Sequence, residues 1–209
     1  FVGVVACLAV VASFGVAVTQ LVALLAQPEG ARVVVADWIA IGSLSVPWAI
    51  QVDTLSVTMM LMVSGVSTLI HIYATGYMHE DVRFQGDPGR YTRFFVYFNL
   101  FVAAMMVLIT GDSFLTLFVG WEGVGLCSYL LIGFWYEKGA GGIGNAVAGK
   151  KAFVTNRIGD FGFLVAMFLI YTTFGSLQFE EVFLRAEEMG PAGAGALTAI
   201  TLLLLVGAT

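Results

Sequence analysis

The stretch LTLFVGWEGVGLCSYLLIGFW, from Leu115 to Trp135, is apolar almost throughout and is about as long as a bilayer-crossing helix. It contains one carboxylic acid, Glu122, close to its middle. An ionised side chain at the bilayer centre costs about 2.5 to 3.5 kcal/mol even on lenient insertion scales, so an acid retained there points to a function. The stretch therefore predicts a membrane-spanning helix that carries a functional carboxyl group.

The composition of the whole chain agrees with a membrane protein. Hydrophobic residues make up 59% of the sequence and charged residues only 11%, and the mean hydropathy is +0.94. These values lie far from the averages of soluble domains. The net charge of −5 does not indicate a nucleic-acid partner, because most of the surface is expected to contact lipid. No spacing of histidine, cysteine and carboxylate residues suits a metal ion, and no dinucleotide-binding fingerprint is present.

Six apolar segments are long enough, or nearly so, to cross a membrane. Helices are expected, because lipid cannot satisfy free backbone groups and the segments lack the alternating pattern of barrel strands. The predicted fold is an all-α polytopic transmembrane bundle, and residues 1–209 are expected to form one domain that is incomplete at both ends. The expected spans are residues 1–26, 54–78, 92–110, 114–135, 151–173 and 196–209.

The connection over residues 27–53 is predicted to be an external loop rather than a span. It contains β-branched and aromatic residues interrupted by Gly42 and Pro47, which is typical of a short β-hairpin or an extended cap. Asp53 and Asp112 directly precede expected spans, so we expect both to cap helix N-termini.

The basic residues predict the orientation of the bundle, since short cytoplasmic loops contain an excess of lysine and arginine. Of the nine basic residues, six lie in the connections after the second and fourth spans. Arg32 and Arg185 lie in the other connections, and Arg157 lies within a span. The connections after the second and fourth spans, together with Phe1, are therefore expected on the cytoplasmic side. These two connections contain Arg83, Arg90, Arg93, Lys138, Lys150 and Lys151.

Glu122 is the main candidate for chemistry. Burial disfavours the ionised carboxylate, so such a group can load and release a proton near neutral pH. Gly120, Gly123 and Gly125 flank it and allow a neighbouring helix to approach closely, which favours a polar partner on another helix. The alternative is a permanently protonated acid held only by hydrogen bonds.

The next span carries a second group of charges. Arg157 and Asp160 are three residues apart and share a helix face, and Lys150 lies seven residues before Arg157, roughly in line with it. One interpretation is a charged path from the cytoplasmic surface toward the membrane centre. The alternative is a structural Arg157/Asp160 ion pair, with Lys150 and Lys151 acting as topology anchors.

The second span presents a polar face that includes His71. This face is either a hydrated path with His71 as a proton relay or a set of interhelical hydrogen bonds, and we favour the second interpretation. The other members of the face are Ser64, Ser67, Thr68 and Thr75.

Three stretches together resemble a known family: VDTLSVTMMLMVSGVSTLIHIYATGYM at 52–78, YTRFFVYFNLFVAAMMVLITGDSFLTLFVGWEGVGLCSYLLIGFWYE at 91–137, and KKAFVTNRIGDFGF at 150–163. They are similar to the antiporter-like subunit L of bacterial NADH-quinone oxidoreductase (respiratory complex I), the counterpart of mitochondrial subunit 5. The run GWEGVGLCSYLLIGFW is the most specific part.

The resemblance implies a proton-translocating subunit of the membrane arm, in the bacterial cell membrane or the mitochondrial inner membrane, without a redox cofactor of its own. FMN, iron–sulfur clusters, NADH and quinone would be bound by other subunits, and the sister antiporter-like subunit M would be a partner. By position, Glu122 resembles the glutamate of the family's proton channel, Arg157 with Asp160 resembles the charged pair that modulates it, and Lys151 aligns with a basic residue. The family's glutamate works opposite a lysine on a later, broken helix, expected just after Thr209.

One alternative of a different class remains. The large subunit of a multisubunit Na⁺/H⁺ antiporter resembles the same region, so a secondary transporter is the second hypothesis.

Overall fold

The computed structural model describes residues 1–42, 44–85 and 87–208, with the side chains of residues 81, 83–85, 88, 191 and 192 left aside. Within this part of the chain, the structure has five long apolar helices, a shorter sixth and a two-stranded hairpin at one end of them, which confirms the predicted membrane bundle. The long helices are α1 (Val2–Ala26), α2 (Thr54–Gln85), α3 (Pro88–Thr110), α4 (Phe114–Ile132) and α5 (Gly144–Phe174), and the short apolar one is α7 (Ala194–Ala208).

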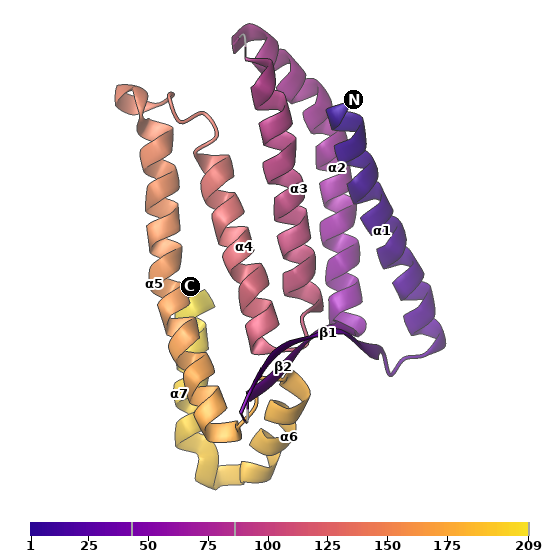
Figure 1. Cartoon of the computed structure of the whole chain (residues 1–209), viewed down its shortest axis with the longest axis vertical. Helices are drawn as coiled ribbons and strands as arrows, with labels where there is room; N and C mark the ends of the chain where they lie inside the picture. Colours follow the sequence, from indigo (N-terminus) through magenta and orange to yellow (C-terminus); the bar gives the residue numbers. More distant parts are fainter. Residues whose placement is uncertain (43, 86, 209) are drawn as a thin grey trace.

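The helices form a layered row. Figure 1 shows α5, α4, α3 and α2 standing side by side in that order, with α1 against α2 and α3 and with α7 along the lower half of α5. The chain start, the α2 to α3 turn and the α4 to α5 connection lie at one end of the row. The hairpin and the amphipathic helix α6 (Phe179–Met189) lie at the other end. The basic connections therefore share one end, although the side chain of Arg83 is outside the described part.

The predicted hairpin is present at the end opposite the chain start. Strands β1 (Ala31–Ile41) and β2 (Leu44–Val52) pair in antiparallel register, with Arg32 opposite Gln51, and two irregularities interrupt the pairing. The rings of Trp38 and Trp48 meet edge to face at 5.0 Å. In Figure 1 the hairpin crosses beneath the ends of α3 and α4.

Several elements differ from the sequence prediction, and helix α2, for example, runs to Gln85 rather than ending at residue 78. Helix α5 begins at Gly144, whereas the expected span begins at residue 151. The expectation began too late because the polar and glycine-rich run before Lys151 lacks the hydropathy of a span. Helical hydrogen bonds nevertheless continue through this run. Helix α6 was not predicted, since four glutamates among its eleven residues hide its apolar face from a hydropathy scan. A short 3₁₀ turn, η2 (Gly190–Gly193), then leads into α7.

Small residues bring neighbouring helices together. A methyl group on Gly120 would overlap the backbone of Leu108 in α3, and one on Gly123 would lie 2.9 Å from Cβ of Ala104. The main apolar core lies toward the hairpin end of the bundle. There, the second half of α5 packs against α7, the start of α4 and β2. Its buried members include Val46, Phe114, Phe163, Met167, Ile170, Phe174 and Ile200.

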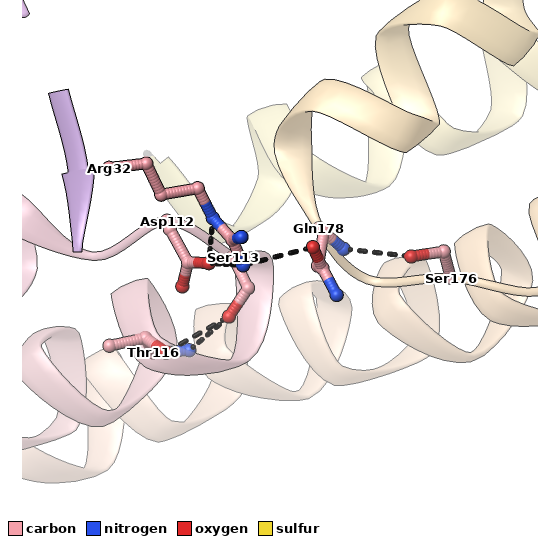
Figure 2. Close-up of polar contacts among 6 residues, drawn as sticks. All are labelled: Arg32, Asp112, Ser113, Thr116, Ser176 and Gln178. Carbon is pink, nitrogen blue, oxygen red and sulfur yellow. Dashed lines mark hydrogen bonds and ion pairs between the residues drawn. The ribbon is translucent and has the colours of Figure 1, made fainter. Parts of the chain in front are cut away.

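A polar junction ties three connections together at the hairpin end (Figure 2). Arg32 of β1 donates hydrogen bonds to Oδ2 of Asp112, at 3.0 Å from Nε and 2.7 Å from Nη2, and Nη2 also donates to Oε1 of Gln178 at 3.1 Å. The predicted capping role of Asp112 is therefore wrong. Ser113 caps α4 instead, since its Oγ accepts the backbone N–H of Thr116 at 3.1 Å.

Asp53, in contrast, caps α2 as predicted. Its Oδ1 accepts the backbone N–H of Ser56 at 2.7 Å, and the Ser56 hydroxyl oxygen accepts the N–H of Asp53 at 2.7 Å. Burial opposes ionisation of Asp53, but the hydrogen bonds from Ser56, Gln51 and Leu55 outweigh it and lower the pKa of the carboxyl group.

Candidate functional site: a charged cluster between two membrane helices

Glu122 has a charged partner on the neighbouring helix. Its Oε2 contacts Nη1 of Arg157, so the carboxylate of α4 and the guanidinium of α5 form an ion pair between two membrane-spanning helices. The same Nη1 lies 3.8 Å from Oδ2 of Asp160, one turn farther along α5. Arg157 is therefore shared between two carboxylates, and the structure brings together three of the residues singled out by sequence.

Asp160 is the most buried member of the cluster. Its side chain is 6% exposed, compared with 24% for Glu122 and 41% for Arg157. The indole Nε1 of Trp121 donates a hydrogen bond of 2.9 Å to Asp160 Oδ1. Trp121 precedes Glu122 in α4, so consecutive residues of one helix contact the two charged residues of the other. The sequence prediction missed Trp121, although an indole N–H next to an intramembrane acid signals a donor that needs an acceptor.

The charges of this cluster do not balance. Arginine stays protonated in proteins, so with both carboxylates ionised Glu122, Arg157 and Asp160 sum to −1. One added proton makes the cluster neutral, which is the less costly state in a low-dielectric environment. The guanidinium also lies 4.5 Å above the ring of Phe153, a cation–π contact that holds it on this face of α5.

The glycines around Glu122 do not all face its partner. Gly120 and Gly123 pack against α3, on the other side of α4, whereas Gly125 lies next to Asn156 of α5, with 3.7 Å between an ideal Cβ and Nδ2. The expected close approach of a neighbouring helix is confirmed, but it mainly joins α4 to α3.

Lys150 and Lys151 are not part of the cluster. Both are exposed on α5, well inside the helix, and within the described residues neither ammonium group contacts Glu122, Arg157 or Asp160. They lie between the charged cluster and the end of the bundle that carries the basic connections.

His71 lies elsewhere, in the interface between α2 and α3. It is fully buried, its Nδ1 is 2.8 Å from the carbonyl of Ser67, and its ring stacks on Phe98 with the centroids 4.1 Å apart. Its Nε2 has no hydrogen-bond partner among the described residues. Helix α3 separates it from the α4 and α5 pair.

Among the described residues, the hydroxyl groups of Ser64, Thr68 and Thr75 bond within α2, and the hydrogen bond between helices on this face is donated by Tyr91 of α3 to the carbonyl of Thr75, at 3.5 Å. Thr68 donates to the carbonyl of Ser64 at 2.8 Å, Thr75 donates to Ile72 at 2.7 Å, and Ser64 donates to Met60. All three acceptors belong to α2 itself. A hydroxyl in an apolar helix can satisfy itself on the preceding turn, and no pattern of sequence spacing reveals which option is taken.

An open cavity lies beside this cluster, between four helices. It has a volume of about 670 Å³ and is lined by residues of α3, α4, α5 and α7, including Trp121, Ser128, Asn156 and Asp160. Asp160 thus borders both the ion-pair cluster and this cavity. Across the described residues, no three histidine, cysteine or carboxylate side chains lie close enough to hold a metal ion.

Two family models match parts of this chain. Residues 38–95 match the family described as NADH-ubiquinone oxidoreductase (complex I), chain 5 N-terminus, and residues 111–209 match the one described as NADH:quinone oxidoreductase/Mrp antiporter, TM. The NADH-quinone oxidoreductase subunit L of Mycobacterium tuberculosis is 47% identical over 205 residues, which cover 97% of this chain and 30% of that protein. The Escherichia coli subunit L is 43% identical over 82% of this chain and 26% of its own length. The chain thus spans between 26 and 30% of the length of these relatives.

Two solved structures share the fold. A chain of the archaeal membrane-bound sulfane sulfur reductase, a respiratory membrane complex, superposes with a TM-score of 0.76 at 18% identity, over 97% of this chain and 37% of that one. A chain of the Mrp complex from Dietzia sp. DQ12-45-1b superposes with a TM-score of 0.68 at 22% identity, over 98% of this chain and 23% of that one.

Proposed function

Because this multi-pass membrane chain is a homologue of NADH-quinone oxidoreductase subunit L, we propose that it forms part of an antiporter-like subunit that moves protons across the membrane. The observation that carries the proposal is the contact of Glu122 with Arg157 and, through it, with Asp160. The cluster has one negative charge in excess and sits between two apolar helices, which suits reversible uptake of a single proton.

The proposed cycle uses these three residues. A proton arriving from the end of the bundle with the basic connections protonates Glu122, and the attraction between Glu122 and Arg157 falls. Arg157 then shifts toward Asp160, which is 3.8 Å away and is held in place by Trp121. When Glu122 releases its proton onward, the original ion pair forms again. The charge of the cluster changes only by the one proton that Glu122 gains and then loses, because the guanidinium keeps its protons throughout.

Lys150 and Lys151 are proposed to act at the entry of this path. They lie on α5 between the basic end of the bundle and the cluster, and their positive charges disfavour a second proton nearby. For His71, the stacking on Phe98 and the bond to Ser67 support a structural role better than a relay.

The partners and energy source follow from the relatives and are also proposals. The subunit would lie in the membrane arm next to the sister antiporter-like subunit M, in a bacterial cell membrane or the mitochondrial inner membrane. Other subunits would bind NADH, FMN, iron–sulfur clusters and quinone and supply the redox free energy. On the described part of this chain, no site for such a cofactor is proposed.

A second candidate function is supported by two findings. The family matched by residues 111–209 includes Mrp antiporters, and a chain of an Mrp complex shares the fold. The chain would then belong to the large subunit of a multisubunit Na⁺/H⁺ antiporter. Purification of the intact assembly distinguishes the two, since flavin and iron–sulfur absorbance accompany the chain only in an oxidoreductase.

The central experiment replaces Glu122 by glutamine in the full-length subunit within its complex. Proton uptake into membrane vesicles and NADH:quinone turnover are then measured together. We expect fewer protons per NADH with the assembly intact, because the neutral amide has the carboxyl's shape but cannot exchange a proton. The matched control is Glu187→Gln, which changes an exposed glutamate of α6 that has no partner among the described residues. Unchanged proton uptake in Glu122→Gln would refute the proposed role.

A further inference from the structure

A small cavity opens at the end of the bundle that carries the basic connections. It has a volume of about 260 Å³ and lies between the starts of α3 and α5 and the end of α4. Arg93 and Tyr97 of α3 form one wall, and Tyr129 of α4 with Tyr136 from the following connection forms another. A cationic group and three phenols thus surround a space that the proton path does not use.

The guanidinium of Arg93 has hydrogen-bonding capacity to spare. Its one ion pair within the described residues is a long one, 3.7 Å to Oδ2 of Asp87, and the side chain is 37% exposed. That carboxylate oxygen already accepts a hydrogen bond of 3.0 Å from Nε of Arg90. A guanidinium has five N–H donors, so most of those on Arg93 remain available for another acceptor.

The phenols that line the cavity are also free to bond. In the part of the chain that the structure describes, the hydroxyls of Tyr97, Tyr129 and Tyr136 make no hydrogen bond. The charges nearby favour an anion. Arg90, Arg93 and Lys138 provide three positive charges, and Asp87 and Glu137 provide two negative ones, which leaves +1 around the opening. Arg90 contacts Glu137 as well as Asp87 and therefore shares its single positive charge between the two carboxylates.

The cavity lies where the headgroup of a lipid would be. Gly133, which lines it, directly follows the last residue of α4, and Arg93 lies in the first turns of α3. Toward the membrane interior, the same helices expose Leu100 and Leu126, which are 46% and 42% accessible. The arrangement offers donors at the membrane surface and a hydrocarbon-covered face below them, and this combination fits a lipid better than a free anion.

We propose that this cavity binds the phosphodiester group of an anionic phospholipid in the leaflet at the basic end of the bundle. Arg93 pairs with the phosphate, the tyrosine hydroxyls donate to its oxygens, and the acyl chains lie along Leu100 and Leu126. The proposal does not depend on proton transfer by Glu122, so either can fail without the other.

The test uses the full-length subunit in its purified complex, placed in phosphatidylcholine nanodiscs that contain a photoactivatable phosphatidylglycerol. After illumination, mass spectrometry locates the labelled peptides. We expect labelling of the α3 and α4 segments around Leu100 and Leu126, and a decrease of about tenfold in Arg93→Gln, the size expected for loss of a charge-assisted hydrogen bond. Tyr129→Phe, which retains the ring and so leaves packing unchanged, should decrease labelling by a smaller factor.

Glu187→Gln, in α6 at the opposite end of the bundle, is the control, because it changes one exposed charge without touching the cavity wall or the charges around its opening. Its labelling should stay near that of the unmodified complex. Equal labelling in Arg93→Gln, Tyr129→Phe and the unmodified complex would overturn the proposal. Loss of labelling on addition of inorganic phosphate would also overturn it, since that result assigns the cavity to a free anion.

Discussion

The carboxylate of Asp112 is paired with the guanidinium of Arg32, 80 positions earlier in the chain, through a contact of 2.7 Å. The pair connects the hairpin to the turn between α3 and α4, and Gln178 extends it to the start of α6. The two partners differ in burial: the side chain of Asp112 is 1% exposed and that of Arg32 is 35% exposed.

This difference in burial predicts unequal effects of removing each partner. Arg32→Gln leaves a buried carboxylate without a counter-ion and is expected to destabilise the full-length subunit by about 3 kcal/mol. Asp112→Asn leaves a guanidinium that water can reach, so about 1 kcal/mol is expected. Thermal unfolding of the two variants in detergent measures both. Equal losses of stability would show that the ion pair is not the main reason for the burial of Asp112.

The packing of α4 on α3 gives a second prediction. Gly120→Ala introduces a methyl group that overlaps the backbone of Leu108, so the helices must separate, and we expect a loss of about 1 to 3 kcal/mol in stability. Gly125→Ala is the control, since the nearest atom to its methyl group is 3.7 Å away. The two alanine variants are compared by thermal unfolding of the assembled subunit. A smaller loss for Gly120→Ala than for Gly125→Ala would contradict the close α3 and α4 contact.

The cap of α2 predicts a pH dependence. Because the pKa of Asp53 is lower in the folded protein than in the unfolded chain, its contribution to stability is present above the ordinary aspartate pKa of about 3.9 and is lost as the pH falls through the folded-state value. Ser56→Ala removes one reciprocal partner and is expected to cost about 1 kcal/mol at neutral pH. Its stability difference from the unmodified protein, followed by denaturation at several pH values, should shrink in acid. A constant difference would assign the effect to the hydroxyl alone.

Removing the indole N–H of Trp121 is expected to change proton uptake without changing the packing of the helices. Trp121→Phe keeps an aromatic ring but removes the N–H that bonds to Asp160, a bond to a charged group worth about 1.5 to 3 kcal/mol. If Asp160 alternates with Glu122 for Arg157, proton uptake per NADH should fall while NADH:quinone turnover persists. Trp38→Phe, in the hairpin and far from the cluster, controls for the loss of an indole. Normal coupling in Trp121→Phe would show that Asp160 needs no orientation by the indole.

The candidate site was partly visible in the sequence. Glu122 could be identified because a carboxyl group in an apolar run is costly, and Arg157 and Asp160 because they lie three residues apart on one helix. The pairing of Arg157 with Glu122 could not be read from spacing. It depends on how α5 is rotated about its axis against α4, and contacts between many side chains decide that rotation together. For the same reason, Trp121 was missed.

By itself, the sequence determined that the chain forms apolar membrane helices and a hairpin, because a bilayer accepts only backbones whose hydrogen bonds are satisfied internally. It also determined which side chains are too polar for that environment. Only the tertiary structure decided which of those side chains meet: Arg157 with Glu122, Trp121 with Asp160, and Arg32 with Asp112. The physical reason is that hydropathy and helical period are local properties, whereas a contact between helices depends on packing that extends over the whole bundle.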